Sequence, residues 1–399
     1  MNVLAINCGS STLKFQLLDV DTERRLAYGV VDRIGGEAEV DFQVEGGAAL
    51  REAAVVADHD EATRRAIGWL EGVGFGRRSV DAVGHRVVHG GGRFVEPTIM
   101  DDAVVDAIQG LGELAPLHNA PALSSIWAAR AVLGAAVPMV ATFDTAFHRT
   151  LSQRASQYAI PPELAARHRI RRYGFHGLAH RYMAERYAEI TSTSFEETKL
   201  ITLQLGAGCS ATAVDGGLSV DTSMGYTPLE GLMMATRSGD LDPSLAGFLA
   251  RREDVPVGEV EDWLNTRSGL LGVSGRSGDM RELLAAEAAG DERAALAVEI
   301  FCYRVRKYIG AYLAVLGGAD AVVFGGGIGE NAPAVRSRIC DDMGWCGLNL
   351  DEDRNTAAVG SEARISSQKA SLHAYVIPVD EGVVIVRDTV SCLRRRGRT

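Results

Sequence analysis

The stretch Leu4–Asp19, LAINCGSSTLKFQLLD, consists of two short apolar runs joined by a polar turn. This pattern predicts a β-hairpin, because β-rich runs on either side of a Gly/Ser turn pair as antiparallel strands. A hairpin turn needs only one or two Gly, Asn or Asp residues. This turn and the residues beside it hold an amide, three hydroxyl groups and a lysine, namely Asn7, Ser10, Ser11, Thr12 and Lys14. So many donors suit an anionic ligand, although an ordinary polar turn with a chance lysine fits the same letters.

The composition is that of a globular protein with an acidic surface. The chain has 399 residues, of which 46% are apolar and 23% charged, and its net charge is -11. This length predicts two or three domains. Basic residues cluster only near the end, at Arg394–Arg398, so the chain lacks the positive footprint of a nucleic-acid-binding protein. A negatively charged substrate would have to be met by a local group of arginines and lysines.

The cysteines and the apolar runs predict a cytoplasmic protein without a membrane segment. The six cysteines form no C-x-x-C pair, which is typical of reduced thiols in a cytoplasm. The chain starts directly with an expected strand, so we expect no signal peptide. The longest uncharged apolar stretch, Ala131–Phe143, contains Pro138 and is too short to cross a bilayer.

Strand patterns alternate with helix patterns, which predicts an α/β protein with mixed sheets. The expected strands are 2–6, 13–18, 82–88, 138–143, 200–205, 210–214, 320–326 and 374–379. The longest expected helix lies within 291–318, where Phe301, Val305, Tyr308 and Tyr312 form one apolar stripe and two glycines follow.

A second hairpin pattern resembles the first. Residues 200–217, LITLQLGAGCSATAVDGG, again read as strand, glycine-rich turn and strand. Two hairpins can look alike by chance, but a true repeat would give two related domains whose turns face each other across a cleft. The stretch 148–164 lacks periodicity and holds a pair of prolines, so we expect the domain boundary near residue 150.

A third glycine-rich turn follows an expected buried strand at 322–331, VVFGGGIGEN, with a helix expected to begin near Asn331. Glycine lets backbone approach a ligand closely, and the N-terminus of a helix favours anions. The chain has no Gly-Lys pair and hence no Walker P-loop. Three glycine-rich strand ends together indicate phosphate handling, although each alone is weak.

Charged side chains also follow expected strands, where open α/β sheets bind ligands. They include Arg86, Asp144, Arg237 and Glu381. Arginines with a pair of carboxylates and glycine-rich turns suit phosphoryl transfer, which needs positioning and positive charge. The pairs His85/His89 and His176/His180 have helical metal-ligand spacing. We do not expect a zinc site, because the first pair lies at a strand exit and no H-E-x-x-H motif occurs.

Nine blocks in this order resemble the acetate kinase family over essentially the whole chain. They are 7–19 (NCGSSTLKFQLLD), 84–91 (GHRVVHGG), 115–121 (APLHNAP), 143–148 (FDTAFH), 171–177 (RRYGFHG), 222–243 (TSMGYTPLEGLMMATRSGDLDP), 274–282 (SGRSGDMRE), 325–331 (GGGIGEN) and 376–389 (VIPVDEGVVIVRDT).

The resemblance implies two duplicated ribonuclease H-like domains of the sugar kinase, Hsp70 and actin superfold around a central cleft. The domains would be 1–149 and a nucleotide-binding domain 150–381, with a C-terminal helix of about 382–399 packing back on the first. The implied reaction is reversible, direct in-line phosphoryl transfer from ATP to acetate, giving acetyl phosphate and ADP. Mg²⁺ is the implied cofactor, with Mn²⁺ as an alternative, and the implied assembly is a homodimer.

The resemblance also assigns site residues. The implied catalytic residues are Asp144, His176 and Arg237. Those implied to bind acetate are Arg86 and the apolar pocket Val88, Leu117, Phe175 and Pro228. Those implied to bind nucleotide or phosphate are Asn7, Ser10, Thr12, Lys14, His118, Gln204, Gly206, Gly208, Asp279, Arg281, Gly327, Ile328, Gly329, Glu330 and Asn331. The implied metal ligands are Asn7 and Glu381.

On chemical grounds, we do not expect the catalytic role implied for Asp144 to be that of a general base. Acetate is already ionised at neutral pH, because carboxyl pKa values lie near 4. No general base is needed to deprotonate it, so we expect Asp144 to orient the nucleophile or a metal-bound water.

The chain departs from the family pattern at two places. The family's second phosphate turn typically reads His-Leu-Gly-Asn-Gly, whereas 204–208 reads Gln-Leu-Gly-Ala-Gly, and the usual Thr-Ser after His176-Gly177 is replaced by Leu-Ala. Backbone donors can suffice at such a turn, or the phosphoryl donor can differ, with pyrophosphate or another nucleotide as candidates. Two further alternatives stay open: a kinase of propionate or butyrate, and, more remotely, a nucleotide-binding protein without catalysis.

Overall fold

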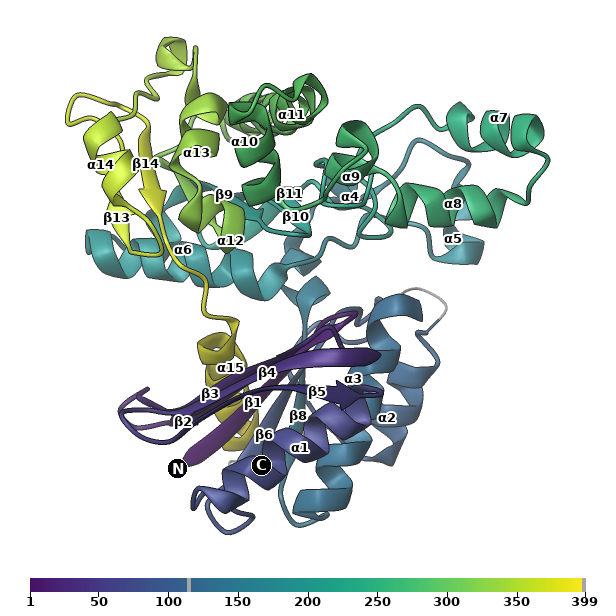
Figure 1. The fold of residues 1–399 in the computed structure, drawn as a ribbon, viewed down its shortest axis with the longest axis vertical. Helices are drawn as coiled ribbons and strands as arrows, with labels where there is room; N and C mark the ends of the chain where they lie inside the picture. Colours follow the sequence, from purple (N-terminus) through teal and green to yellow (C-terminus); the bar gives the residue numbers. More distant parts are fainter. Residues whose placement is uncertain (113–115, 397–399) are drawn as a thin grey trace. The chain divides into compact units, whose positions relative to one another are not determined.

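The computed structural model describes residues 1–112 and 116–396, with side chains omitted for 116–118. The chain divides into two compact units, Met1–Phe147 with Asp380–Thr399, and His148–Val379. Each unit is built on one mixed β-sheet with helices (Figure 1), as the α/β prediction requires. Asp380 and Glu381 belong to the first unit, whereas the sequence placed them at the end of a second domain 150–381.

The sheet of the first unit has eight strands in the order β5-β4-β3-β2-β1-β6-β8-β7. Their bounds are β1 (Asn2–Cys8), β2 (Thr12–Asp19), β3 (Arg25–Asp32), β4 (Gly36–Val44), β5 (Ala49–Val56), β6 (Ala82–Val87), β7 (Thr98–Ile99) and β8 (Met139–Phe143). Strands β1, β6 and β8 run parallel, and the meander β1 to β5 is antiparallel.

The helices of the first unit are α1 (His59–Gly72), α2 (Asp102–Gln109), α3 (Pro116–Leu133) and α15 (Glu381–Arg396). The 3₁₀ helix η1 (Asp144–Thr150) follows β8 and continues into the second unit. α1 begins where the Asp58 carboxylate accepts a hydrogen bond from the Glu61 backbone N–H.

The pleat of β1 gives the sheet two different faces. Leu4, Ile6 and Cys8 point to one side and join the hydrophobic core, which also holds apolar side chains of α1, α2 and α3. Residues between them, such as Ala5 and Asn7, point to the other side because strand side chains alternate. The face opposite the hydrophobic core therefore carries Ala5 and the polar Asn7.

Helix α15 packs against β1, β6 and β8 on this second face. At Gly84, on β6 beside Ala5, a β-carbon would lie 2.4 Å from Thr389 Oγ1 and 2.5 Å from Ile385 Cγ2. The missing side chain at Gly84 lets the helix lie directly on the sheet. Arg86, two residues further along β6, shares this face.

The sheet of the second unit has six strands in the order β11-β10-β9-β12-β14-β13. Their bounds are β9 (Lys199–Leu205), β10 (Cys209–Asp215), β11 (Leu218–Thr222), β12 (Ala321–Gly325), β13 (Ala363–Arg364) and β14 (His373–Val376). Strands β9, β12 and β14 are parallel, and β10 and β11 are antiparallel to their neighbours.

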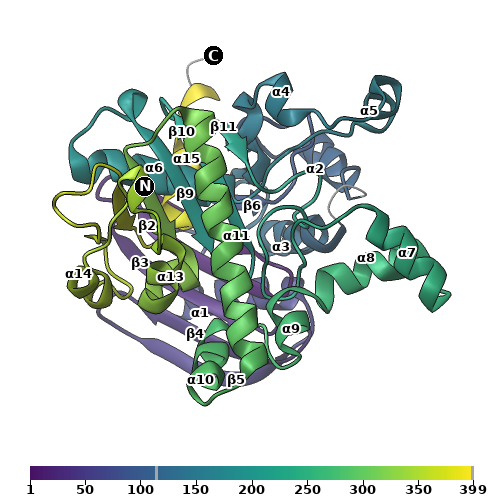
Figure 2. The ribbon, with the colours of Figure 1, turned by 90° about the horizontal axis from the view of Figure 1, so that it is seen from above.

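Thirteen helices are described in this unit. They are α4 (Gln153–Ser156), α5 (Pro162–His168), α6 (Gly177–Thr191), η2 (Phe195–Glu197), α7 (Ser244–Glu253), α8 (Val257–Thr266), α9 (Gly269–Ser274), α10 (Met280–Ala288), α11 (Glu292–Leu316), α12 (Gly326–Asn331), α13 (Pro333–Cys340), η3 (Gly344–Cys346) and α14 (Glu352–Ala357). Figure 2 shows the long α11 running across β9 and β10. Its apolar stripe is buried except at the half-buried Tyr308, and it ends at Gly317 in the left-handed conformation, as predicted.

The two sheets repeat one topology. In each, an antiparallel hairpin leads to a third strand, and two further strands lie parallel to the first: β1-β2-β3 with β6 and β8, and β9-β10-β11 with β12 and β14. Strands β1 and β9 both have seven residues and the same order of buried and half-buried positions, which makes Asn7 and Gln204 equivalent. The duplicated fold predicted from the two hairpins is confirmed.

Two local expectations were incomplete. Strands β3, β4 and β5 were not predicted, because their outward positions carry many charged or polar residues that weaken the apolar pattern. Helix α12 begins at Gly326, not near Asn331. Gly325 is its extended N-cap and Gly326 adopts a φ of +75°, so the glycines themselves turn the strand into the helix.

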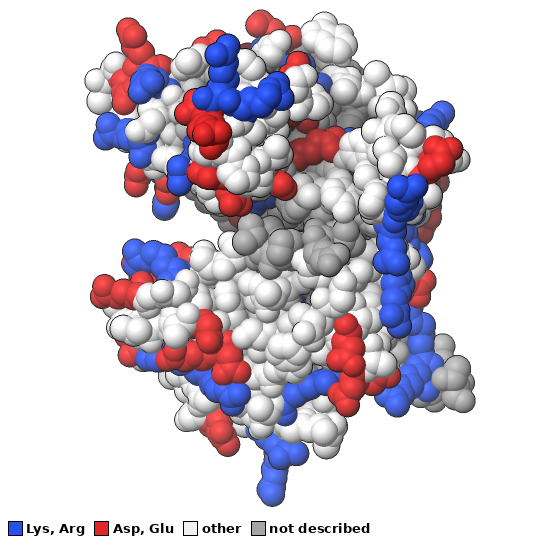
Figure 3. All heavy atoms as spheres, turned by 90° about the vertical axis from the view of Figure 1, so that its right-hand side faces the viewer, with Lys and Arg blue, Asp and Glu red and all other residues white. Residues whose placement is uncertain are grey.

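Acidic and basic side chains are scattered together over the face seen in Figure 3, in keeping with the mixed charge of the sequence. Among the described residues, no helix is long and apolar enough to cross a membrane. All six cysteines are free thiols.

The fit of α15 on β6 can be tested at Gly84. We expect Gly84→Ala to destabilise the protein by about 1–3 kcal/mol, since the added carbon overlaps two buried side chains. Gly36→Ala on β4 is the matched control, because a β-carbon there meets no atom within 4 Å, and its effect should stay within about 0.5 kcal/mol. Urea unfolding monitored by circular dichroism measures both, and equal midpoints would contradict this packing.

Candidate functional site

A cluster of four polar side chains lies at the ends of parallel strands in the first unit. Asn7 comes from β1, Arg86 from β6 and Asp144 from the residue directly after β8. Glu381 is the first residue of α15. Asn7 and Arg86 are register partners in the parallel pair, so their side chains share one face.

Asp144 and Asn7 hold the Arg86 guanidinium. Arg86 Nε donates to Asp144 Oδ1 at 2.8 Å and Nη2 donates to Asp144 Oδ2, which makes a two-point ion pair. Arg86 Nη1 donates to Asn7 Oδ1 at 2.9 Å, and Asn7 Nδ2 donates to Glu381 Oε2. The amide of Asn7 therefore links the arginine to the carboxylate at the start of α15.

The ion pair keeps Arg86 charged in a buried place. Burial by itself lowers the pKa of Arg86, but the carboxylates of Asp144 and Glu381 outweigh it and raise the pKa. The Asp144 side chain is fully buried. Both of its oxygens face the guanidinium, so its visible task is to orient Arg86, a role that the sequence did not suggest.

The predicted turn residues present their donors at the surface beside this cluster. Ser10 and Lys14 are exposed, and Lys14 lies opposite Asn7 in the β1–β2 pairing. Thr12 is half-buried, and its hydroxyl oxygen would lie only 2.6 Å from a β-carbon on Gly9. Glycine at position 9 thus leaves room for the threonine.

The oxygens around Glu381 fit a hard divalent cation. Asp380 and Glu381 are adjacent carboxylates, and the buried Oε1 of Gln16 has no hydrogen-bond partner among the described residues. Gln16 donates its Nε2 to Asp380 Oδ1 at 2.9 Å, which aligns the amide with the acidic pair. Among the described residues no group of three or more His, Cys, Asp or Glu could hold a metal. Mg²⁺ characteristically binds one or two carboxylates together with substrate phosphates.

A second cluster lies in the second unit around the turn between β9 and β10. A β-carbon on Gly208 would lie 3.2 Å from Arg237 Nη2 and 3.3 Å from both Cε1 and Nε2 of His176. The imidazole and the guanidinium therefore converge on the bare backbone of Gly208. The absence of a side chain there leaves a small space between two nitrogen-bearing groups.

Arg237 is a half-buried cation that has no carboxylate partner among the described residues. Its Nη1 donates to the Pro228 carbonyl at 2.9 Å, and no carboxylate lies within ion-pair distance among the described residues. Burial lowers the pKa of Arg237, yet an arginine stays protonated in proteins. A buried charge is normally paired, so this guanidinium is suited to an anion supplied by a ligand.

His176 has a backbone conformation that is uncommon for its residue type. It precedes α6 with a φ of 56°, in the left-handed region. Such conformations cost energy and cluster at functional sites. The position also sets the imidazole beside the N-terminus of a 15-residue helix, which favours anions.

The segment 222–243 carries Pro228 and Arg237, and buried polar contacts hold it in place. Glu230 accepts from the Arg172 guanidinium and from the Tyr158 hydroxyl. Arg172 Nη1 also donates to the carbonyls of residues 222–224. Asp240 accepts from the Tyr308 hydroxyl at 2.7 Å and from the Gly231 backbone N–H at 2.9 Å.

The sequence drew attention to Arg172 and Asp240 as charged residues near expected strand ends, but it did not suggest their supporting role. Glu230, Tyr158 and Ser210, which contacts His176, were missed. The available signal was their residue type: glutamate, tyrosine and serine within otherwise apolar runs. Which ones pair cannot be read from spacing, since Tyr308 and Asp240 lie 68 residues apart.

The third glycine-rich turn lies beside the second cluster's turn. A β-carbon on Gly206 would lie 3.9 Å from the Gly327 backbone nitrogen. Gly327 and Asn331 are exposed, Ile328 is half-buried and Gly329 is buried. The fully buried Arg336, also missed by the sequence analysis, donates to the carbonyls of Gly329 and Glu330 and fixes the end of α12.

Glu330, expected to contact the nucleotide, has a structural role in the turn. Its Oε1 accepts from the backbone N–H groups of Gly326 at 2.8 Å and Val379 at 3.0 Å. These bonds tie the start of α12 to the strand exit after β14. One oxygen of the Glu330 carboxylate is thus used to shape the turn.

Other predicted residues are placed as follows. Asp279 caps α10 by accepting from the Arg281 N–H and pairs with the Arg281 guanidinium, whose side chain is 90% exposed. Gln204 is half-buried, and its buried Oε1 has no partner among the described residues.

The four residues expected to line the acyl pocket are not all in one unit. Val88 lies in the first unit, and Phe175 and Pro228 lie in the second. Val88 and Phe175 are buried and Pro228 is half-buried. The side chains of Leu117 and of His118, the predicted phosphate ligand, lie outside the described residues.

Three histidines of the two pairs with metal-ligand spacing form hydrogen bonds within the protein. His176 and His180 both contact the Ser210 hydroxyl, at 2.8 and 2.7 Å. His89 Nδ1 accepts from the Gly91 backbone N–H at 2.8 Å. Burial lowers the pKa of His85 to about 3 and that of His89 to about 4, so both rings are neutral.

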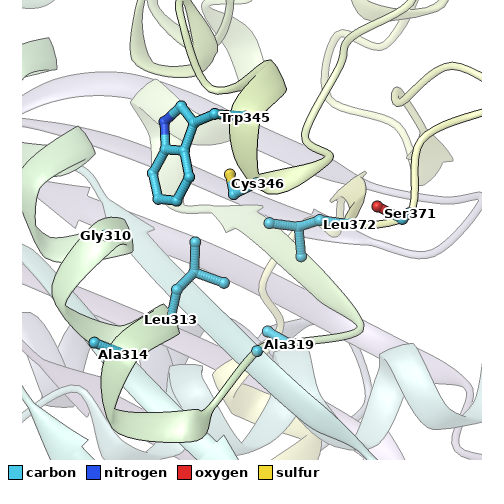
Figure 4. A pocket seen from close by; sticks show the side chains of 9 residues that line it. Gly310, Leu313, Ala314, Ala319, Trp345, Cys346, Ser371 and Leu372 are labelled. Carbon is cyan, nitrogen blue, oxygen red and sulfur yellow. The ribbon is translucent and has the colours of Figure 1, made fainter.

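A separate pocket of about 400 Å³ lies at the C-terminal end of α11. Leu313, Leu372 and the exposed Trp345 line it together with small residues (Figure 4). No charged side chain lines it, so it does not suit a phosphate-bearing ligand.

Comparison with known proteins decides the family. The model of the acetokinase family matches residues 2–387. The chain belongs to the acetokinase family. Members of this family are kinases that transfer a phosphoryl group to a carboxylate.

The relatives cover almost the full length of the chain. It is 51% identical to the acetate kinase of Solibacter usitatus, with 98% of each chain covered. It is 46% identical to that of Chloroherpeton thalassium, with 99% of this chain and 100% of the relative covered.

Solved structures agree in fold. A crystal structure of Porphyromonas gingivalis acetate kinase is 38% identical with a TM-score of 0.90, covering 98% of this chain and 99% of that one. A propionate kinase from Francisella tularensis is 37% identical with a TM-score of 0.91 and the same coverage. The sugar kinase and actin-like fold predicted from the resemblance is thus confirmed.

The space at Gly208 can be tested by filling it. We expect Gly208→Ala to weaken ATP binding about 10-fold, because the new methyl group takes the place between Arg237 and His176 where an anion would lie. Isothermal titration measures the affinity. Gly258→Ala in α8 is the control, since a β-carbon there has no neighbour within 4 Å. Unchanged ATP affinity in Gly208→Ala would show that phosphates bind elsewhere.

Proposed function

We propose that this chain is a reversible kinase that transfers the terminal phosphoryl group of ATP to acetate, giving acetyl phosphate and ADP. The carrying observation is Arg237, a half-buried cation without a carboxylate partner among the described residues, which converges with His176 on the bare backbone of Gly208. Membership of the acetokinase family supports the identity of the acceptor. The acetate oxygen forms a bond to phosphorus as the bond from phosphorus to the ADP oxygen breaks.

Arg86 is proposed to bind the carboxylate of acetate and to lower its repulsion from the phosphoryl group. Two anions must approach each other in this reaction, and an arginine at the transition state contributes about 10³ to 10⁵ in rate. Arg86 is held in place by Asp144 and Asn7 before substrate arrives, so little reorganisation is needed. Because acetate is already ionised, Asp144 acts through Arg86 as a positioning residue.

Arg237 and His176 are proposed to contact the transferred phosphoryl group, since both aim nitrogen atoms at Gly208. Glu381 would hold Mg²⁺, or Mn²⁺, through its carboxylate oxygen. Asn7, the second proposed ligand, would first have to turn its Oδ1 from Arg86 towards the metal, because its Nδ2 now donates to Glu381. The metal, when bound to the phosphates, neutralises their charge. The acidic pair Asp380 and Glu381 with the unpaired oxygen of Gln16 supports this assignment.

The nucleotide is proposed to lie on the glycine-rich turns of the second unit. Backbone groups there are accessible because Gly206, Gly208 and Gly327 carry no side chain. Gln204, Ile328, Gly329, Asn331, Asp279 and Arg281 are the further contacts proposed. Glu330 contributes by shaping the turn. Ser10, Thr12, Lys14 and His118 remain the proposed donors to the phosphates.

Propionate is the second candidate acceptor, because the related Francisella structure is that of a propionate kinase. Val88, Leu117, Phe175 and Pro228 remain the residues proposed to contact the acyl chain. One methylene group changes selectivity by only about 10- to 200-fold, so the assay has to compare acids directly. We further propose that the protein is cytoplasmic, which its six free thiols support, and that it forms a homodimer, which the family resemblance supports.

The test is a hydroxamate assay of acyl phosphate formation with acetate, propionate and butyrate, each with ATP, GTP and pyrophosphate. We expect acetate with ATP to give the highest kcat/KM. A higher value with propionate would select the second candidate. A higher value with pyrophosphate would show that the turn Gln204–Gly208 has changed the phosphoryl donor. No acyl phosphate with any pair would end the proposal.

The variants Arg86→Ala and Arg237→Ala test the proposed roles of the two arginines in the same assay. Each should lower kcat by about 100-fold or more, which corresponds to about 3 kcal/mol of activation free energy. Near-normal turnover in either variant would remove that arginine from the proposed chemistry.

The role of Asp144 is tested by combining variants. If Asp144 acts only by holding Arg86, the double variant Arg86→Ala/Asp144→Asn should be no slower than Arg86→Ala alone, within about 2-fold. Arg237→Ala/Asp144→Asn provides the comparison, since there the two losses should multiply. Multiplying losses in the Arg86 pair would show that Asp144 has a task of its own, such as general base.

A further inference from the structure

A chain of buried hydrogen bonds leads from the interior of the second unit to His176. His176 Nδ1 lies 2.8 Å from Ser210 Oγ, and Ser210 Oγ lies 2.7 Å from His180 Nε2. His180 Nδ1 lies 2.8 Å from Thr202 Oγ1. His180, Ser210 and Thr202 are fully buried. None of the three had a role in the sequence-based site.

Counting hydrogens shows that the chain can point in only one direction at a time. Each hydroxyl group has one hydrogen and each neutral imidazole has one N–H. If Thr202 donates to His180 Nδ1, then His180 must donate from Nε2 to Ser210. The Ser210 hydrogen is then left for His176 Nδ1, the other partner of this hydroxyl among the described residues. The proton of a neutral His176 is then on Nε2. Reversing the first bond reverses all the others.

The distances favour donation by Thr202. Its only other acceptor among the described residues is the Thr212 carbonyl at 3.4 Å, against 2.8 Å for His180 Nδ1. A hydrogen bond weakens at such a length, so the Thr202 hydrogen goes to the ring. The direction that follows gives His176 an N–H on the edge that lies beside Gly208 and Arg237.

Four described groups near His176 and its hydrogen-bond chain are cationic or neutral. Arg237, from the segment 222–243, adds a cation beside Nε2. On α6, burial lowers the pKa of His180 well below its usual range. On η1, burial lowers the pKa of His148, whose ring lies 5.9 Å from that of His180, to about 4. On β10, burial raises the pKa of the Cys209 thiol to about 12, so this neighbour carries no negative charge.

We propose that Thr202, His180 and Ser210 form a relay that holds His176 neutral with its proton on Nε2, aimed at the transferred phosphoryl group. The part concerning the phosphoryl group rests on the proposed function. Phosphoryl oxygens only accept hydrogen bonds, so the proton must be on this nitrogen. Ser210, His180 and Thr202 are positioning residues, since they act through His176.

The tautomer can be read without any enzymatic assay. In protein labelled with ¹⁵N-histidine, nitrogen-15 NMR at pH 8 should show His176 with Nε2 protonated and Nδ1 bare, and His180 likewise. The variant His176→Asn assigns the signals. A neutral His176 protonated on Nδ1, or an imidazolium at this pH, would overturn the relay. This result stands even if the protein forms no acyl phosphate, so failure of the relay and failure of the proposed function are separable.

Ser210→Ala gives the functional test. Without the serine donor, neutral His176 loses its fixed tautomer, whereas imidazolium at low pH still offers Nε2–H. We expect kcat to fall about 10-fold at pH 8.5 and much less at pH 6, with KM for acetate changed by less than about 2-fold. The wild-type profile should lack this alkaline loss. An equal loss at both pH values would indicate a structural role only and would overturn the proposal.

Thr202→Val and Thr212→Val form a matched pair. Both are buried threonines that lie opposite each other in the β9–β10 pairing, but the Thr212 hydroxyl bonds Thr222 and stands outside the relay. We expect Thr202→Val to introduce the alkaline loss and to disturb the His180 tautomer, although it touches no atom of His176. Thr212→Val should leave both the pH profile and the tautomers unchanged. The same effect from both variants would contradict the relay.

Discussion

The pleat of the first strand in each unit decides which side chains can become functional. Alternate residues of β1 are sealed in the hydrophobic core, so Asn7 falls on the opposite face together with Arg86 of the neighbouring strand. The same register in the second unit brings Gln204 beside Ser210. A shift of one residue in either hairpin would send these polar groups into the core. The apolar packing therefore fixes the polar arrangement.

The two arginines at these strand ends illustrate different solutions to burying a positive charge. Arg86 is stabilised by protein groups, with a two-point carboxylate partner and an amide. Arg237 has a single carbonyl from Pro228 and no carboxylate among the described residues. The first arrangement fixes a geometry in advance, and the second leaves a charge for a ligand to complete. Both depend on supporting residues such as Asp144 and Glu230, whose removal would alter the arginine's position without touching its chemistry.

Buried hydroxyl groups have a similar importance in the second unit. Serine and threonine on β9 and β10 are inconspicuous in the sequence, yet inside the protein their hydroxyl groups bond both nitrogens of His180. In a medium of low dielectric constant, a hydrogen bond of fixed direction is strong and an unpaired polar atom is costly. Which group donates each of these buried hydrogen bonds is therefore fixed by the structure, as a side-chain rotamer is.

The sequence by itself determined the α/β class, the two hairpins, the long α11 and the family, because each depends on local patterns or on many matching residues along the chain. It also selected Arg86, Asp144, His176 and Arg237 as candidates. Only the tertiary structure decided that Asp144 faces Arg86, that Glu330 serves the backbone of its own turn and that His180 shares a serine with His176. These pairings join residues from different strands and helices. They arise from packing, which a pattern of letters does not contain.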